Sequence, residues 1–160
     1  MRRNTKGDIS MKIPRRKLNI ILFWLYCAVM LYLLFNRQGG VEGVPYWDQI
    51  RRNLNLEPLH TVKLFLNALD KPAYTSAAFV NLNGNVVMFI PLGLLLPQVF
   101  PKCSRLWSVL LTSALAITLV EITQLFTLLG CCDIDDLILN LVGTLIGYGI
   151  YVYQTKKPAQ

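Results

Sequence analysis

The stretch LWSVLLTSALAITLVEITQLFTLLGCCDIDDLILNLVGTLIGYGIYVY, residues 106–153, decides the fold of this chain. It contains two long apolar runs, 106–129 and 137–153, separated by a short acidic segment. A helix of about 20 apolar residues is long enough to cross the hydrocarbon core of a bilayer. Glu121 and Gln124 lie inside the first run, although ionisable groups at that depth are costly unless they are paired or functional. The stretch therefore predicts two membrane helices that carry functional polar groups.

Composition extends this prediction to the whole chain. The 160 residues are 54% hydrophobic and 16% charged, with a mean hydropathy of +0.43, whereas soluble domains are about 25% charged. Two further apolar runs precede the stretch quoted above. We expect an all-α membrane protein with a single membrane domain over residues 18–153. Its four transmembrane helices are predicted at about 18–36, 76–100, 105–129 and 135–153.

The distribution of charge predicts the topology. Seven of the sixteen Lys and Arg residues lie within the N-terminal segment 1–17, and the turn 101–105 and the tail 154–160 carry bases without acids. The turn 130–136 carries three acids and no base. Because cytoplasmic loops are enriched in Lys and Arg, both termini are expected in the cytoplasm. The N-terminal basic cluster fits anionic lipid. We expect no nucleic-acid partner, because no folded segment surrounds the cluster.

The segment 36–75 is then expected outside the membrane. Its second half has an amphipathic spacing, which predicts a short helix lying in the outer interface. The apolar residues with that spacing are Leu59, Val62, Phe65, Leu66 and Leu69.

This topology places the unusual polar residues on one side of the membrane. Glu121 is sixteen residues past Arg105, so it should lie about 24 Å from the cytoplasmic end of its helix. The other polar residues come at the outer end of a predicted helix or in the acidic turn. We expect them to form one outer-leaflet site. Its candidate residues are Asn85, Glu121, Gln124, Asp133, Asp136 and Asn140.

Helical spacing groups these residues further. Thr118 is predicted to share a face of the third helix with Glu121 and Gln124, and Asp135 to point away from the main stripe of the fourth. That stripe consists of Asp133, Asp136, Asn140, Gly143 and Gly147. The two glycines allow close approach of another helix, either the third helix or a second copy in a homodimer. Asp133 also has a purely structural interpretation as a helix N-cap.

In these residues the chain resembles the VanZ-like family of small bacterial membrane proteins. The resemblance spans roughly residues 51–150 and lies in the ordered motifs NLEP at 55–58, NVVMFIPLG at 85–93, EITQ at 121–124, DIDDLILNLVG at 133–143 and GY at 147–148. Many members carry an Arg between the third and fourth motifs, where this chain reads LLGCC. The resemblance implies a role in the cell envelope and a location in the bacterial cytoplasmic membrane. The family's founding member confers low-level resistance to the lipid-tailed glycopeptide teicoplanin.

Three hypotheses about function follow. The first is a binding or accessory protein, with the bilayer as partner, whose site engages an envelope lipid, a peptidoglycan precursor lipid or a lipoglycopeptide. The second is a membrane enzyme, with Glu121 as acid or base and a hard divalent cation held by Asp133, Asp136 and Asn140. The third is a carrier in which Glu121 exchanges a proton. We favour binding over catalysis because no nucleophile or His is clearly placed in the site, and the sequence requires no cofactor.

Overall fold

A computed structural model describes residues 14–36, 39–60, 63, 66 and 72–156. Its helices are α1 (Arg15–Phe35), α2 (Tyr46–Arg52), α4 (Pro72–Val99), α5 (Leu106–Thr127) and α6 (Ile134–Lys156), with a 3-10 turn η1 (Pro101–Cys103) before α5. The strands β1 (Leu54–Asn55) and β2 (Cys132–Asp133) have two residues each. Four of the helices, α1, α4, α5 and α6, are long and apolar enough to cross a membrane. The prediction of a largely helical protein with four such helices is therefore confirmed.

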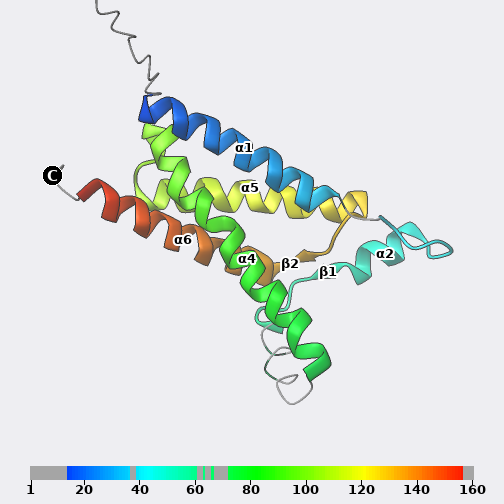
Figure 1. The fold of residues 1–160 in the computed structure, drawn as a ribbon. Coiled ribbons are helices and arrows are strands. Elements are labelled where there is room, and N and C mark those ends of the chain that lie inside the picture. The colour runs from blue at the N-terminus through cyan, green and yellow to red at the C-terminus, as the bar shows by residue number, and fades with distance from the viewer. Residues whose placement is uncertain (1–13, 37–38, 61–62, 64–65, 67–71, 157–160) are drawn as a thin grey trace, which may run out of the picture.

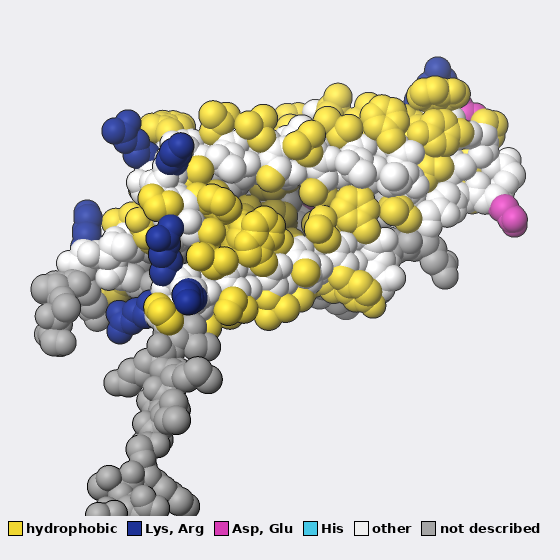
Figure 2. Space-filling view, turned by 90° about the horizontal axis from the view of Figure 1, so that it is seen from above, with side chains coloured by type: hydrophobic (Ala, Val, Ile, Leu, Met, Phe, Trp, Pro, Cys, Tyr) yellow, Lys and Arg dark blue, Asp and Glu magenta, His cyan; other side chains and the backbone are white. Residues whose placement is uncertain are grey.

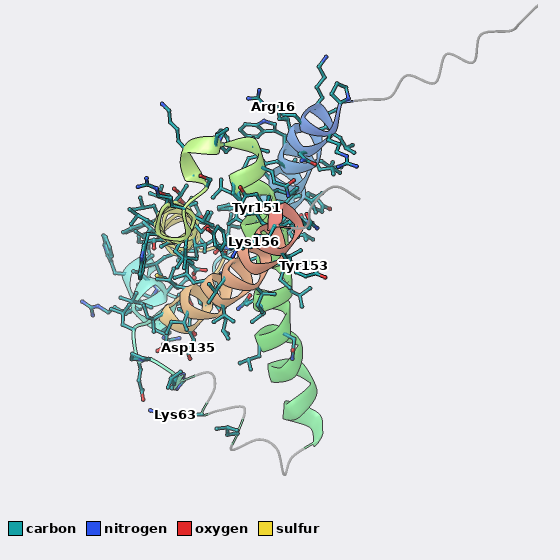
Figure 3. The ribbon with its side chains drawn as sticks, turned by 90° about the vertical axis from the view of Figure 1, so that its left-hand side faces the viewer. Arg16, Lys63, Asp135, Tyr151, Tyr153 and Lys156 are labelled. Atoms are coloured by element: carbon teal, nitrogen blue, oxygen red, sulfur yellow. The ribbon has the colours of Figure 1, made fainter. Side chains whose placement is uncertain are left out.

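The four long helices form one bundle, which α4 crosses obliquely (Figure 1). The start of α1 and the end of α6 lie at one end of this bundle, and β1, β2 and α2 lie at the other. Asp135 is accordingly at the start of α6 and Lys156 at its far end (Figure 3). Hydrophobic side chains cover the length of the molecule in Figure 2, with Lys and Arg gathered mainly at one end and Asp and Glu visible at the opposite end.

The interior of the bundle is small because large apolar side chains face outward. Phe23, Leu96 and Val109 are buried in one cluster, and Met30 and Ile117 belong to a second cluster nearer the acidic end. Many other leucines and aromatics on the same helices are exposed. An apolar exterior is what a helix bundle surrounded by lipid tails requires, since the surrounding solvent is itself apolar.

The glycines of α6 fix its position against α4. A Cβ atom at Gly143 would lie 2.0 Å from the Val86 carbonyl oxygen, and one at Gly147 would lie 2.0 Å from that of Ile90. Gly93 makes the reciprocal approach, because a Cβ there would lie 1.9 Å from the Thr144 carbonyl oxygen. The main partner of this face is thus α4 rather than the predicted third helix, although α5 also contacts α6. In the single chain described, α4 covers the face considered for a homodimer.

The segment that follows α1 pairs with the acidic turn before α6. The β1 and β2 strands pair in parallel, with Leu54 opposite Cys132 and Asn55 opposite Asp133. Tyr46 of α2 donates a hydrogen bond of 2.8 Å from its hydroxyl to the Phe126 carbonyl at the end of α5. Most of the predicted interfacial helix, with Val62, Phe65 and Leu69, lies outside the described residues.

Candidate functional site

A cavity of about 450 Å³ opens among the middle of α4, the last turns of α5, the first turns of α6 and the segment between α5 and α6. All six residues of the predicted site line it: Asn85, Glu121, Gln124, Asp133, Asp136 and Asn140. We call it the polar cavity. Asn53 and Cys131 also contribute to its wall, as do the apolar side chains of Leu34 and Phe89.

Asp133 links the acidic turn to the β1 segment. One carboxylate oxygen accepts a hydrogen bond of 2.8 Å from the Asp135 backbone amide, which is an N-cap of α6. The other accepts one of 3.1 Å from the Asn55 side-chain amide. Asn55 in turn lies 3.4 Å from the His60 ring nitrogen. The capping interpretation of Asp133 is therefore correct, and the same carboxylate also lines the polar cavity.

Asp136 links α6 to α4. The Asn85 side-chain amide donates a hydrogen bond to one Asp136 carboxylate oxygen. Both side chains line the polar cavity, so this pair forms one wall of it. Asp136 also belongs to the first turn of α6, where the positive end of the helix dipole favours a carboxylate.

Glu121 and Asn140 are both buried in the interior of the bundle. Glu121 is 7% exposed and Asn140 is 3% exposed. The Asn140 side-chain oxygen is buried and has no hydrogen-bond partner among the described residues. Buried acceptors in proteins are almost always satisfied. Asn140 lines the cavity, and its side-chain oxygen lacks a hydrogen-bond donor among the described residues.

The polar residues of α5, the predicted third membrane helix, lie only partly where the spacing placed them. Gln124 is 3% exposed, and its amide donates a bond of 2.8 Å to the Leu34 carbonyl at the end of α1. Thr118 is exposed and does not line the polar cavity, so its predicted place beside Glu121 and Gln124 is wrong. Residues 118 and 124 are about 120° apart around a helix of 3.6 residues per turn, too far to share one face.

Asp135 points away from the polar cavity, as the spacing predicted. It is 1% exposed, and its carboxylate accepts a hydrogen bond from the Leu59 backbone amide. Leu59 has φ 63°, a left-handed conformation that is rare for a leucine. The helical spacing of the sequence did not predict that the Asp135 carboxylate binds the backbone at Leu59. The contact of Asn55 with Asp133 was also missed, and the one signal for it was that Asn55 begins the NLEP motif.

A second cavity, of about 240 Å³, adjoins the first and is lined almost wholly by apolar side chains of α1, α4 and α5. We call it the apolar cavity. It shares Leu34, Phe89, Glu121 and Asn140 with the polar cavity. Leu31 of α1 also lines it and is 53% exposed, so the apolar cavity reaches the outer face of the bundle.

The electrostatic character of the polar cavity is acidic. Three carboxylates line it, from Glu121, Asp133 and Asp136, and no Lys, Arg or His is among the described lining residues. Burial raises the pKa of the adjacent Cys132 thiol, and the charges of Glu121 and Asp133 raise it further. The described residues contain no group of three or more His, Cys, Asp or Glu side chains placed to hold a metal ion. Asp133 and Asp136 therefore do not converge with a third such ligand here.

The fold and the site define a multi-pass membrane protein with one polar cavity at the acidic end of its bundle. The model of the family described as VanZ/LLP1 matches residues 23–155, and the chain belongs to this family. It is similar to the protein VanZ of Enterococcus faecium, with 32% identity over 140 residues, which cover 87% of this chain and 76% of that protein. No solved structure matches the chain significantly.

Proposed function

We propose that this protein binds an amphiphile of the outer leaflet in the bacterial cell envelope, and that the polar cavity receives the head group. The amphiphile is an envelope lipid, a peptidoglycan precursor lipid or the lipid anchor of a lipoglycopeptide. Through this binding the protein alters susceptibility to teicoplanin, as its family membership suggests. The observation that carries the proposal is the continuity of a polar cavity with an apolar one, which share Glu121 and Asn140.

The orientation follows from charge. Arg15 and Arg16 of α1 and Lys156 of α6 lie at the end of the bundle where α1 begins, and Asp135 and Asp136 in the first turn of α6 lie at the other end (Figure 1). With the basic end in the cytoplasm of a bacterial cell, the polar cavity faces outward. Envelope precursors and glycopeptides that act outside the cell would meet the protein on that side.

Binding fits the lining better than catalysis does. The polar cavity offers carboxylates and amides, which are hydrogen-bonding groups suited to recognition of a head group. Catalysis of acyl or phosphoryl transfer would need an activated nucleophile or a bound metal. The enzyme and carrier hypotheses make different predictions for the same variants and are tested with them.

The test compares teicoplanin susceptibility and envelope lipid composition in cells that express the wild type, Glu121→Gln or Asp136→Asn. Glu42→Gln is the matched control, because Glu42 is exposed and lies outside both cavities. A binding protein loses its phenotype with either site variant without accumulating a substrate. An enzyme also loses the phenotype with either variant, but its substrate accumulates. A proton carrier loses the phenotype with Glu121→Gln and keeps it with Asp136→Asn.

Immunoblotting of membranes establishes that each variant is present at wild-type abundance. If both site variants retain the full phenotype at that abundance, the polar cavity has no role and the proposal is wrong.

A further inference from the structure

The two cavities together have the shape of a site for a molecule with one polar end. The polar cavity of about 450 Å³ and the apolar cavity of about 240 Å³ meet at Glu121 and Asn140. Ligand sites of a few hundred Å³ commonly combine an apolar wall with a few placed polar groups. A ligand that fills both cavities would lay its apolar chain among Met30, Ile117 and Leu92 and its head group between α4 and α6.

The charge of the polar cavity selects the kind of head group. Three carboxylates line it, and no Lys, Arg or His is among the described lining residues. A third cavity lies next to the polar cavity and shares Asn53 and Leu128 with it. Arg52 lines this third cavity but not the polar cavity. In a site of low dielectric constant, a phosphate against these carboxylates would be repelled, whereas a cation would be attracted.

Asn140 supplies an independent observation. Its side-chain oxygen is buried without a partner among the described residues, and Asn140 lines both cavities. An amide oxygen is an acceptor, so the missing partner must be a donor. A phosphate ester oxygen cannot supply one, and neither can a quaternary ammonium, which has no N–H group.

From these two observations we infer that the ligand is an amphiphile with a single apolar chain and a primary ammonium head group. Its N–H groups donate to the Asn140 side-chain oxygen and to the carboxylates of Glu121 and Asp136. This inference rests on the proposed function, since it names the head group that the polar cavity receives. Two sources share this chemistry: a single-chain aminophospholipid of the membrane, whose ammonium would enter the polar cavity while its phosphate stays outside the carboxylates, and an exogenous cationic amphiphile with an amine.

The experiment measures binding to the full chain in nanodiscs of phosphatidylcholine, with bound copies counted by native mass spectrometry. Dodecylammonium is compared with dodecyltrimethylammonium and dodecyl phosphate, which share its chain. Lysophosphatidylethanolamine is compared with lysophosphatidylcholine, which has the same phosphate and lacks the N–H groups. The first series tests an exogenous amine, and the second tests a membrane lipid.

The expected result is a preference of about tenfold or more for the N–H-bearing member of at least one series. Asn140→Leu, which removes the acceptor, and Glu121→Gln, which removes a charge, should each reduce that preference. Glu42→Gln should leave it unchanged. A preference in the second series alone identifies a membrane lipid as the source, and a preference in the first alone identifies an exogenous amine.

Other results overturn the inference. If dodecyl phosphate binds as well as dodecylammonium, with or without added Mg²⁺, the head group is not an amine although the proposed amphiphile site survives. If no amphiphile binds a protein whose circular dichroism shows intact helices, the proposed function itself fails. If Asn140→Leu keeps the full preference for N–H groups, the recognition does not depend on the acceptor assigned here.

Discussion

At the scale of single residues, the pKa of the Cys132 thiol depends on the charge of Glu121. Burial raises this pKa, and Glu121 and then Asp133 add to this effect. A raised thiol pKa means less thiolate at pH 8, and the thiolate is the species that is alkylated. Glu121→Gln removes one negative charge, so it should lower the Cys132 pKa and speed alkylation at that pH. The rate is measured by mass spectrometry with iodoacetamide, in a background where Cys27, Cys103 and Cys131 are replaced by serine.

Glu42→Gln in the same background is the matched control and should leave the rate unchanged, because Glu42 is not among the causes of the shift. Equal rates for Glu121→Gln and the unsubstituted background would show that Glu121 carries no charge near Cys132.

Asn140 and Asn85 allow a second residue-scale prediction, because the same substitution should act in opposite directions. Asn140→Leu removes a buried acceptor without a partner among the described residues, and such an atom costs about 1–3 kcal/mol. Asn85→Leu instead removes the donor to Asp136. In thermal unfolding in detergent, Asn140→Leu should maintain or raise Tm, and Asn85→Leu should lower it. A lower Tm for Asn140→Leu would mean that its oxygen is satisfied in the folded protein.

Among the secondary-structure elements, the approach of α6 to α4 depends on glycine. Gly147→Ala would place a Cβ 2.0 Å from the Ile90 carbonyl oxygen, and a backbone atom cannot move aside as a flexible side chain can. The two helices would have to separate, which should cost about 1–3 kcal/mol. Gly149→Ala is the control on the same helix, because a Cβ there meets nothing within 4 Å. Unfolding in detergent should show a lower Tm for the first variant and an unchanged or higher Tm for the second.

The same elements show what the sequence could and could not predict. The four long helices were predictable because each is an apolar run of membrane-spanning length, and the grouping of polar residues at one end followed from the charge of the turns. The partner helix of α6 was not predictable, because Gly143 and Gly147 indicate that some helix approaches closely without indicating which one. The pairing of Asn55 with Asp133 joins residues 78 apart in the sequence, and no local pattern encodes such a contact.

For the whole molecule, the remaining prediction is its orientation, because the proposed function requires the polar cavity to face outward. Cys131 is exposed at the acidic end, and Lys102 is exposed at the basic end. Two single-cysteine proteins are compared: one keeps Cys131, and the other carries Lys102→Cys with all native cysteines replaced. In intact cells, a membrane-impermeant maleimide should label the first and spare the second, and it should label both after the membrane is broken. The reverse pattern in intact cells would place the polar cavity in the cytoplasm, where it could not meet an outer-leaflet head group.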